Sequence, residues 1–201
     1  MTLNDFLPLI LPRAKGCPDI LAIFNTRLAI IELCRKALIW REYQEPIPTE
    51  ALATSYEYEV EEGQQVCKLL SLKLSGNDIS VVDPAHGKHL DNAGNASPYA
   101  YGTLSGFELR PAQQAGLSVV TYAAVMPTIS ATAVPDAMGQ YMEAIGHGAL
   151  SRILLSKGKD YHDPDGAGVA KMLWDGAIAD AKADALTGFA RSTIRTSKVW
   201  F

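Results

Sequence analysis

The sequence has little cysteine and no long apolar run. Its three cysteines, Cys17, Cys34 and Cys67, are far apart and form no Cys-x-x-Cys pair, so neither a disulfide framework nor a cysteine zinc site is expected. Apolar runs such as residues 28–31 fall far short of the roughly 20 residues of a membrane-spanning helix. Asp5 stands where a secretory signal would carry basic residues. We therefore expect a protein that is made in the cytoplasm and has no contact with membranes.

Recognisable catalytic signatures are also missing. The chain contains no phosphate-binding glycine loop, no dinucleotide fingerprint and no Gly-x-Ser-x-Gly turn. His86 and His89 could approach a zinc ion, but the other ligands that zinc prefers are absent nearby. His162 precedes Asp163, which is expected to cap a helix. We therefore expect a protein that is not an enzyme and that binds no cofactor and no metal.

Charges of one sign are missing from long stretches of the chain. The sequence carries 18 Lys and Arg against 22 Asp and Glu, a net charge of −4, which argues against a protein that coats nucleic acid. Residues 1–41 hold six bases and three acids, whereas residues 42–65 hold seven glutamates and no Lys or Arg. Residues 135–190 hold eight acids and five bases, and residues 191–201 hold three bases and no acid. This segregation predicts distinct charged surfaces.

Hydrophobic spacing predicts helices at both ends of the chain and strands between them. Periods of three and four residues, with Pro near each start, predict helices over about 18–40, 135–157 and 164–186. Residues 55–130 instead alternate between apolar and polar side chains and are divided by turn residues, which predicts five to seven antiparallel strands. The polar stretch 83–98 is expected to be an exposed loop within this region.

The expected fold class is α+β. We predict one helical domain from residues 1–41 and 135–190, packed as a small bundle. An antiparallel β-rich insertion spans residues 42–134, and an extended C-terminal tail covers residues 191–201.

Two features suggest contacts with other protein chains. The helix at 18–40 is apolar on two faces, so one face can pack in its own domain and the other against a neighbouring subunit. Alternation around Tyr56 and Tyr58 places a set of acidic side chains on the opposite face of a strand, where a basic partner could bind. The candidate inter-subunit residues are Phe24, Leu28, Ile31, Met142, Ile145 and Trp174, and the candidate acidic surface comprises Glu57, Glu59 and Glu61.

The C-terminal tail combines basic residues with terminal aromatics. Large aromatic side chains gain about 1.5–3 kcal/mol on burial. Three alternatives follow for the tail: it folds back on its own helices, it inserts into another chain, or it is disordered. In the second case the basic groups would steer the tail and the aromatics would anchor it. The residues concerned are Arg191, Ile194, Arg195, Lys198, Val199, Trp200 and Phe201.

The C-terminal helical pair resembles the corresponding hairpin of tailed-phage head-to-tail adaptor (connector) proteins. The similarity rests on the stretch Gly148-Ala-Leu-Ser-Arg-Ile-Leu154, on the loop Lys157-Gly-Lys-Asp-Tyr-His-Asp-Pro164, and on Leu173-Trp-x-Gly176 in the helix that follows. The helix leading into Trp40-Arg-Glu-Tyr43 and the apolar run that ends at Pro127 also fit this organisation.

The resemblance implies a structural protein of the virion neck. Members of that family form a ring, usually of twelve copies, beneath the portal of a filled capsid, with the tail segment docked into the portal. Double-stranded DNA crosses the ring during packaging and ejection without specific binding, and the β regions face the next neck or tail component. Alternatives are a stopper or tail-completion protein of the same neck, a cell-wall hydrolase that uses the acidic strand, and a ligand-binding virion protein with a tyrosine platform.

Overall fold

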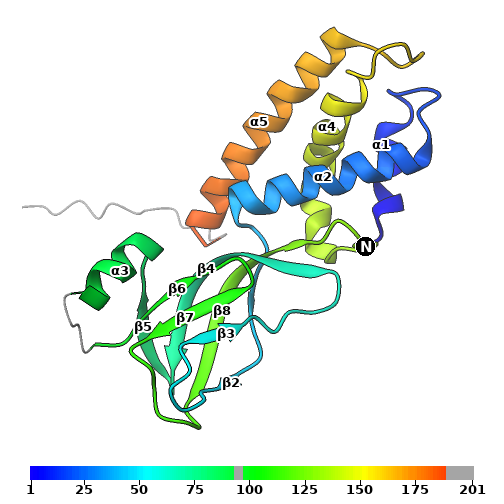
Figure 1. Ribbon diagram of the computed structural model, residues 1–201. Helices are drawn as coiled ribbons and strands as arrows, with labels where there is room; N and C mark the ends of the chain where they lie inside the picture. The colour runs from blue at the N-terminus through cyan, green and yellow to red at the C-terminus, as the bar shows by residue number, and fades with distance from the viewer. Residues whose placement is uncertain (93–96, 189–201) are drawn as a thin grey trace, which may run out of the picture.

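The computed structural model describes residues 1–92 and 97–188 and has an α+β fold. Within these residues the helices form one lobe and a curled sheet forms the other (Figure 1). The elements are η1 (Leu3–Phe6), α1 (Leu7–Ile10), α2 (Asp19–Ala37), β1 (Arg41–Tyr43), β2 (Ile47–Pro48), β3 (Ser55–Glu57), β4 (Gln64–Leu74), β5 (Asn77–Val81), α3 (Pro84–Asn92), β6 (Tyr99–Gly102), β7 (Gly106–Arg110), β8 (Ser118–Pro127), η2 (Asp136–Tyr141), α4 (Met142–Ile153) and α5 (Pro164–Leu186).

Local sequence signals explain the ends of the long helices. Pro18 occupies the N-cap of α2, and Asp19 adds a negative charge at its first turn. The helix ends at Leu38, which adopts the left-handed conformation with φ of 53°. At the start of α5 the Asp163 side chain accepts a hydrogen bond of 2.9 Å from the Gly166 amide, and Pro164 follows at the first helical position. The predicted cap at Asp163 is confirmed.

The sheet is mixed and strongly curled, with the strand order β1-β8-β4-β5-β6-β7-β3, and β2 also pairs with β8. Six strands, β3 to β8, lie within residues 55–130, so the predicted number of five to seven is confirmed. The prediction that all of them are antiparallel was wrong, because β5 pairs with β6 in parallel, with Ser80 opposite Tyr99. β1 and β2 come before this region and bring the sheet of the described residues to eight strands. The register of β4 against β8 shifts between Val66 and Lys68 and again between Leu69 and Ser71. Such irregularities increase strand twist and bend the sheet.

The segment expected to be a loop contains a helix. α3 connects the parallel strands β5 and β6, a connection that requires a crossover rather than a tight turn. Gly87 allows this helix to approach β6, because a Cβ atom there would lie 2.8 Å from the Tyr101 ring. The Tyr99 hydroxyl donates a hydrogen bond of 3.0 Å to the Gly87 carbonyl. The prediction of a loop at 83–98 was therefore wrong for residues 84–92. These residues form a helix that packs against Tyr99 and Tyr101 of β6.

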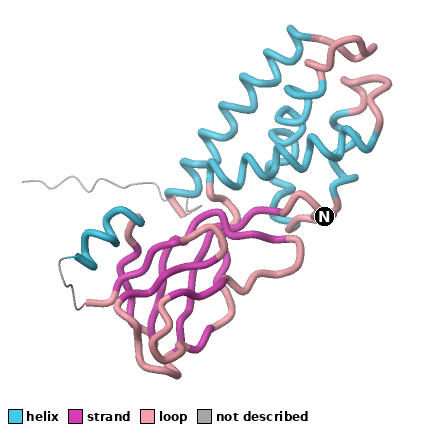
Figure 2. The backbone as a smooth tube through the Cα atoms, in the orientation of Figure 1, coloured by secondary structure: helices cyan, strands magenta, loops and turns pink. Residues whose placement is uncertain are grey.

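The two lobes have separate clusters of buried side chains. One cluster joins α1, α2, α4 and α5 and extends through Ile39 and Trp40 to Val125 of β8. The other fills the concave side of the sheet, with Phe107, Leu72 and Leu109 fully buried. Figure 2 shows the helices gathered on one side of the sheet, with α3 apart from them. α2 therefore connects the lobes, since its end packs against β8.

Candidate assembly surfaces

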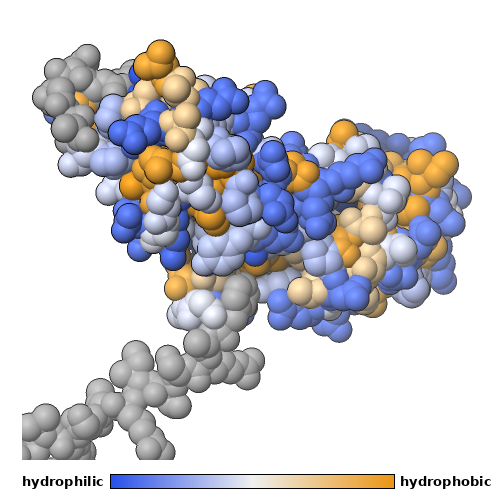
Figure 3. All heavy atoms as spheres, turned by 90° about the horizontal axis from the view of Figure 1, so that it is seen from below, coloured by the Kyte–Doolittle hydropathy of each residue, from blue (hydrophilic) through white to orange (hydrophobic). Residues whose placement is uncertain are grey.

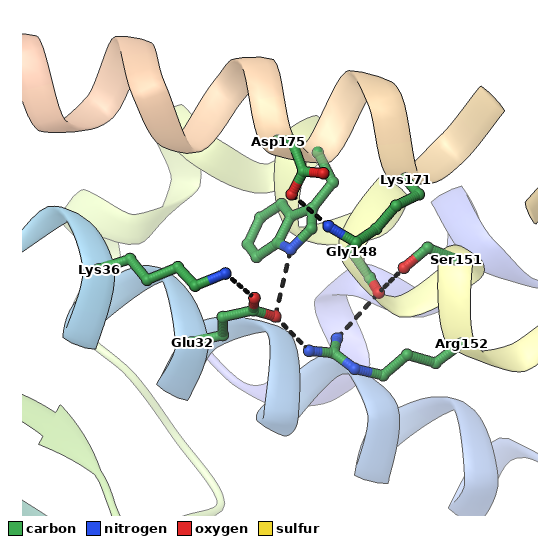
Figure 4. A network of polar contacts seen from close by, with 8 residues as sticks. Glu32, Lys36, Gly148, Ser151, Arg152, Lys171 and Asp175 are labelled. Atoms are coloured by element: carbon green, nitrogen blue, oxygen red, sulfur yellow. Dashed lines mark hydrogen bonds and ion pairs between the residues drawn. The ribbon is translucent and has the colours of Figure 1, made fainter. Parts of the chain in front are cut away.

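A carboxylate joins the three long helices of the helical lobe. Glu32 of α2 accepts hydrogen bonds from the Arg152 guanidinium of α4 and from Lys36 one turn further along α2 (Figure 4). The Trp174 indole of α5 lies 3.3 Å from the same carboxylate, measured from Nε1 to Oε2. Arg152 also donates a hydrogen bond of 2.9 Å to the carbonyl of Gly148. Charge-assisted contacts from three elements fix how α2 sits against α4 and α5.

The electrostatics of Glu32 favour its ionised form. Partial burial by itself raises the pKa of a carboxyl group. Hydrogen bonds from Lys36 and Trp174, together with the positive charges of Arg152 and Lys36, outweigh this effect and hold the pKa of Glu32 below its ordinary value of 4.5. The junction is therefore a charged contact at neutral pH. Glu32 also lines two cavities, one of about 370 Å³ beside Trp174 and one of about 520 Å³ beside Leu28 and Ile31.

A glycine in α4 lets the helices meet closely at this junction. A Cβ atom on Gly148 would lie 2.9 Å from the Trp174 ring and 3.0 Å from the Ala29 side chain. Gly146, two residues earlier, has more room, because the nearest atom to its Cβ would be Leu9 Cβ at 3.5 Å. Gly148 thus allows close packing that a larger residue would prevent.

α2 presents an apolar surface on the side opposite its buried residues. Ile20 is 84% exposed and Phe24 is 42% exposed, while Leu28 and Ile31 are half-buried. These four positions recur at helical spacing and lie across the helix from its core side, which carries Leu33. We call this set the α2 outer face. It includes Phe24, Leu28 and Ile31, which the sequence had indicated as inter-subunit residues.

α5 presents a second apolar surface. Val169 is 56% exposed, Met172 is 68% exposed, and Leu173 and Gly176 are also exposed. These residues lie across the helix from the buried Trp174 and define the α5 outer face. Single exposed hydrophobic residues are common on proteins, whereas a row of them along one helix is a candidate contact site.

Three of the predicted inter-subunit residues, Met142, Ile145 and Trp174, do not lie on either outer face. Ile145 and Trp174 have no exposed surface because both pack in the helical core, so this part of the prediction is corrected. Met142 is half-buried and packs against the same core. The periodicity of α5 marks Val169 and Met172 as apolar positions just as it marks Trp174. Only the tertiary packing shows that the side of α5 that carries Trp174 is buried in the core of its own chain.

The predicted acidic residues lie exposed at one edge of the sheet. Glu57 ends the edge strand β3, and Glu59 and Glu61 follow it in irregular structure. Tyr56 is buried between them and the sheet interior, where its ring stacks on Phe107. The expected alternation of exposed acids and inward tyrosines is present, although the strand ends earlier than predicted. The tail residues 191–201 lie outside the described part of the chain.

A cavity of about 590 Å³ lies in the sheet lobe between β4, the start of α3 and the end of β6. Tyr58, Lys68, Asp83 and Thr103 are among its lining residues. Burial raises the pKa of the Tyr58 phenol to about 12, so this group stays protonated at neutral pH. In the described residues, no three His, Cys, Asp or Glu side chains gather as metal ligands would.

Neither the scan of protein-family models nor the search of curated proteins found a match to this chain. Within residues 1–92 and 97–188, every helix is too short or too polar to cross a membrane.

Proposed function

We propose that this chain is a structural subunit of a tailed-phage neck, the head-to-tail adaptor. In this role identical subunits form a ring beneath the portal, and the resemblance implies the twelve copies that are usual in that family. The ring extends the channel for double-stranded DNA and gives the tail its attachment platform. The chain would act in the virion, without catalysis and without a cofactor.

The observation that carries this proposal is the pair of outer faces on α2 and α5. Each presents a row of apolar side chains that are partly or largely exposed among the described residues. A subunit that needs a neighbour on two different sides is suited to a closed ring. The sequence resemblance of the α4–α5 hairpin supports the same conclusion and supplies the location in the neck.

The remaining surfaces receive roles that follow from this placement. The bundle of N- and C-terminal helices would form the ring wall, and the sheet lobe with Glu57, Glu59 and Glu61 would meet a further neck or tail protein. The tail at 191–201, with its three bases and its terminal Trp200-Phe201, would insert into the portal. A stopper or tail-completion protein would share the ring but would lack this insertion.

A deletion of residues 191–201 tests the proposal. Binding of the purified full-length and shortened chains to portal rings is measured by co-sedimentation and electron microscopy. We expect the full-length chain to decorate the portal as a ring. The shortened chain should stay folded, with an unchanged circular dichroism spectrum, and should lose portal binding.

Two outcomes would contradict this function. Equal portal binding by the shortened chain would remove the tail from the interface and favour another neck component. Absence of the full-length chain from the neck in electron micrographs of labelled virions would refute the adaptor role altogether.

A further inference from the structure

The two outer faces point in different directions. α4 packs against both α2 and α5, and each outer face lies on the side of its helix away from this shared packing. In Figure 1, α2 crosses the lobe while α5 runs along another side of α4. The two faces of one chain therefore cannot be covered together by a single flat partner.

The two helices carry opposite net charge. α2 contains Arg27, Arg35 and Lys36 against Asp19 and Glu32, a net charge of +1. α5 contains four aspartates and two lysines, a net charge of −2. Two copies of α5 brought face to face would juxtapose aspartates, whereas α2 against α5 joins opposite signs. Such complementarity steers association and disfavours the like-charged pairing.

The unpaired charges beside the outer faces strengthen this point. Arg35 follows Ile31 by one turn at the end of the α2 outer face, and Asp165 and Asp180 flank the α5 outer face. Within the described residues, none of the three takes part in an ion pair. These groups are free to pair across a contact between subunits.

Shape agrees with the same pairing. The α2 outer face carries the large side chains of Ile20 and Phe24. The α5 outer face ends at Gly176, where an added Cβ would meet no atom within 4 Å. A large side chain on α2 can pack over the glycine of α5, so the two helices can approach each other closely.

From these observations we infer that the α2 outer face of one subunit packs against the α5 outer face of the next copy of the same chain. The contact is heterologous, because each subunit uses two different surfaces, and its repetition closes a ring or continues as a filament. The closure of the ring rests on the proposed function. The pairing of the two faces rests on the exposure of their residues and on the opposite net charges of α2 and α5.

Mixing of two variants tests the pairing. Phe24→Glu disrupts the α2 outer face, and Met172→Glu disrupts the α5 outer face. Because Phe24 is partly buried, Ile20→Glu serves as a second α2 variant. Leu104→Glu, at a position that is 99% exposed in the sheet lobe, is the matched control. Thermal melting establishes that each variant is folded, and analytical ultracentrifugation up to about 1 mM with native mass spectrometry measures association.

We expect the original chain and Leu104→Glu to associate beyond dimers. Each outer-face variant alone should associate at least tenfold more weakly, the effect of removing an interface anchor. A mixture of an α2 variant and Met172→Glu should form heterodimers and stop there, because this pair retains only one intact contact.

Other outcomes overturn the inference. Homodimers of Phe24→Glu would show that the α5 outer face pairs with itself. Homodimers of Met172→Glu would show the same of the α2 outer face. Association of the outer-face variants equal to that of the original chain would remove these faces from the contact, and so would an original chain that is monomeric at 1 mM. Portal binding is scored separately. A confirmed pairing without portal binding would leave the contact standing and refute the adaptor function.

Discussion

Glu32 is the residue on which the geometry of the helical lobe most depends. Its partners Arg152 and Trp174 lie more than 100 positions further along the chain. Sequence analysis places Glu32 on the charged stripe of its helix but cannot identify partners so distant in sequence. The charges of Arg152 and Lys36 compensate a partly buried carboxylate, so the loss of that negative charge would leave two cations without their acceptor.

We predict that Glu32→Gln lowers the free energy of unfolding by about 1–3 kcal/mol at pH 7, the range for losing hydrogen bonds to a charged group. The pKa of Glu32 is lowered in the folded chain, so its ionisation stabilises the fold above the ordinary carboxyl pKa of 4.5. That contribution is lost as the pH falls through the lower folded value. Urea unfolding between pH 7 and pH 4 should therefore show a difference between the two proteins that is constant down to about pH 5 and shrinks below it.

The control for this prediction is Asp175→Asn, which removes the exposed partner of Lys171 on α5. Exposed pairs one helical turn apart contribute only about 0.3–0.5 kcal/mol. A Glu32→Gln effect no larger than that of Asp175→Asn, or one that grows on acidification, would contradict the assigned role of the junction.

Single residues also show where sequence analysis reached its limit. The predicted helix at 135–157 contains Gly148, and its close neighbour, the Trp174 ring, is identified only by the structure. The same analysis placed Trp174 and Ile145 at a subunit contact, although both are buried in their own core. Periodicity identifies the apolar positions of a helix, but tertiary packing decides which of them the chain covers itself.

At the scale of elements, the helices with local start and stop signals were predictable. The expected helices at 18–40 and 164–186 correspond to α2 and α5, since proline, Asp163 and the apolar spacing act within a few residues. The helix α3 was missed because its sequence is polar and its stability comes from Tyr99 and Tyr101. The parallel β5–β6 pair was missed because strand partners are chosen by non-local contacts.

The cap of α5 can be tested as an element-scale property. We predict that Asp163→Ala lowers the free energy of unfolding by about 0.5–2 kcal/mol, because the Gly166 amide loses its side-chain acceptor. Asp163→Asn should restore most of this loss, since an amide oxygen also caps a helix. Thermal unfolding followed by circular dichroism measures both.

A comparison with Asp165→Ala separates capping from charge. Asp165 lies in the first turn of α5 and is exposed, so its removal costs only the favourable charge at the helix start, about 0.3–1 kcal/mol. If Asp163→Asn were as unstable as Asp163→Ala, the hydrogen bond to Gly166 would not be the source of the effect.

At the scale of the whole molecule, assembly depends on which surfaces remain after folding. Among the described residues, the two-lobed arrangement leaves the outer faces of α2 and α5 partly or largely exposed. Figure 3 shows hydrophobic side chains divided by hydrophilic ones on the face seen from below, and no large continuous apolar patch covers it. This distribution suits contacts made along helices rather than across the sheet.

The last prediction concerns DNA, which an adaptor must let pass. The net charge of −4 gives the chain no overall attraction to phosphates, and proteins that bind DNA without specificity do so at about 10⁻⁴ to 10⁻⁶ M at physiological salt. We predict a dissociation constant weaker than about 10⁻⁴ M for a short duplex at about 150 mM salt, measured by fluorescence anisotropy. Deletion of residues 191–201 removes three bases and changes the net charge from −4 to −7, so any weak binding at low salt should fall further in that variant. Micromolar binding with a steep dependence on salt would mean that the protein holds DNA, and it would contradict a passive channel.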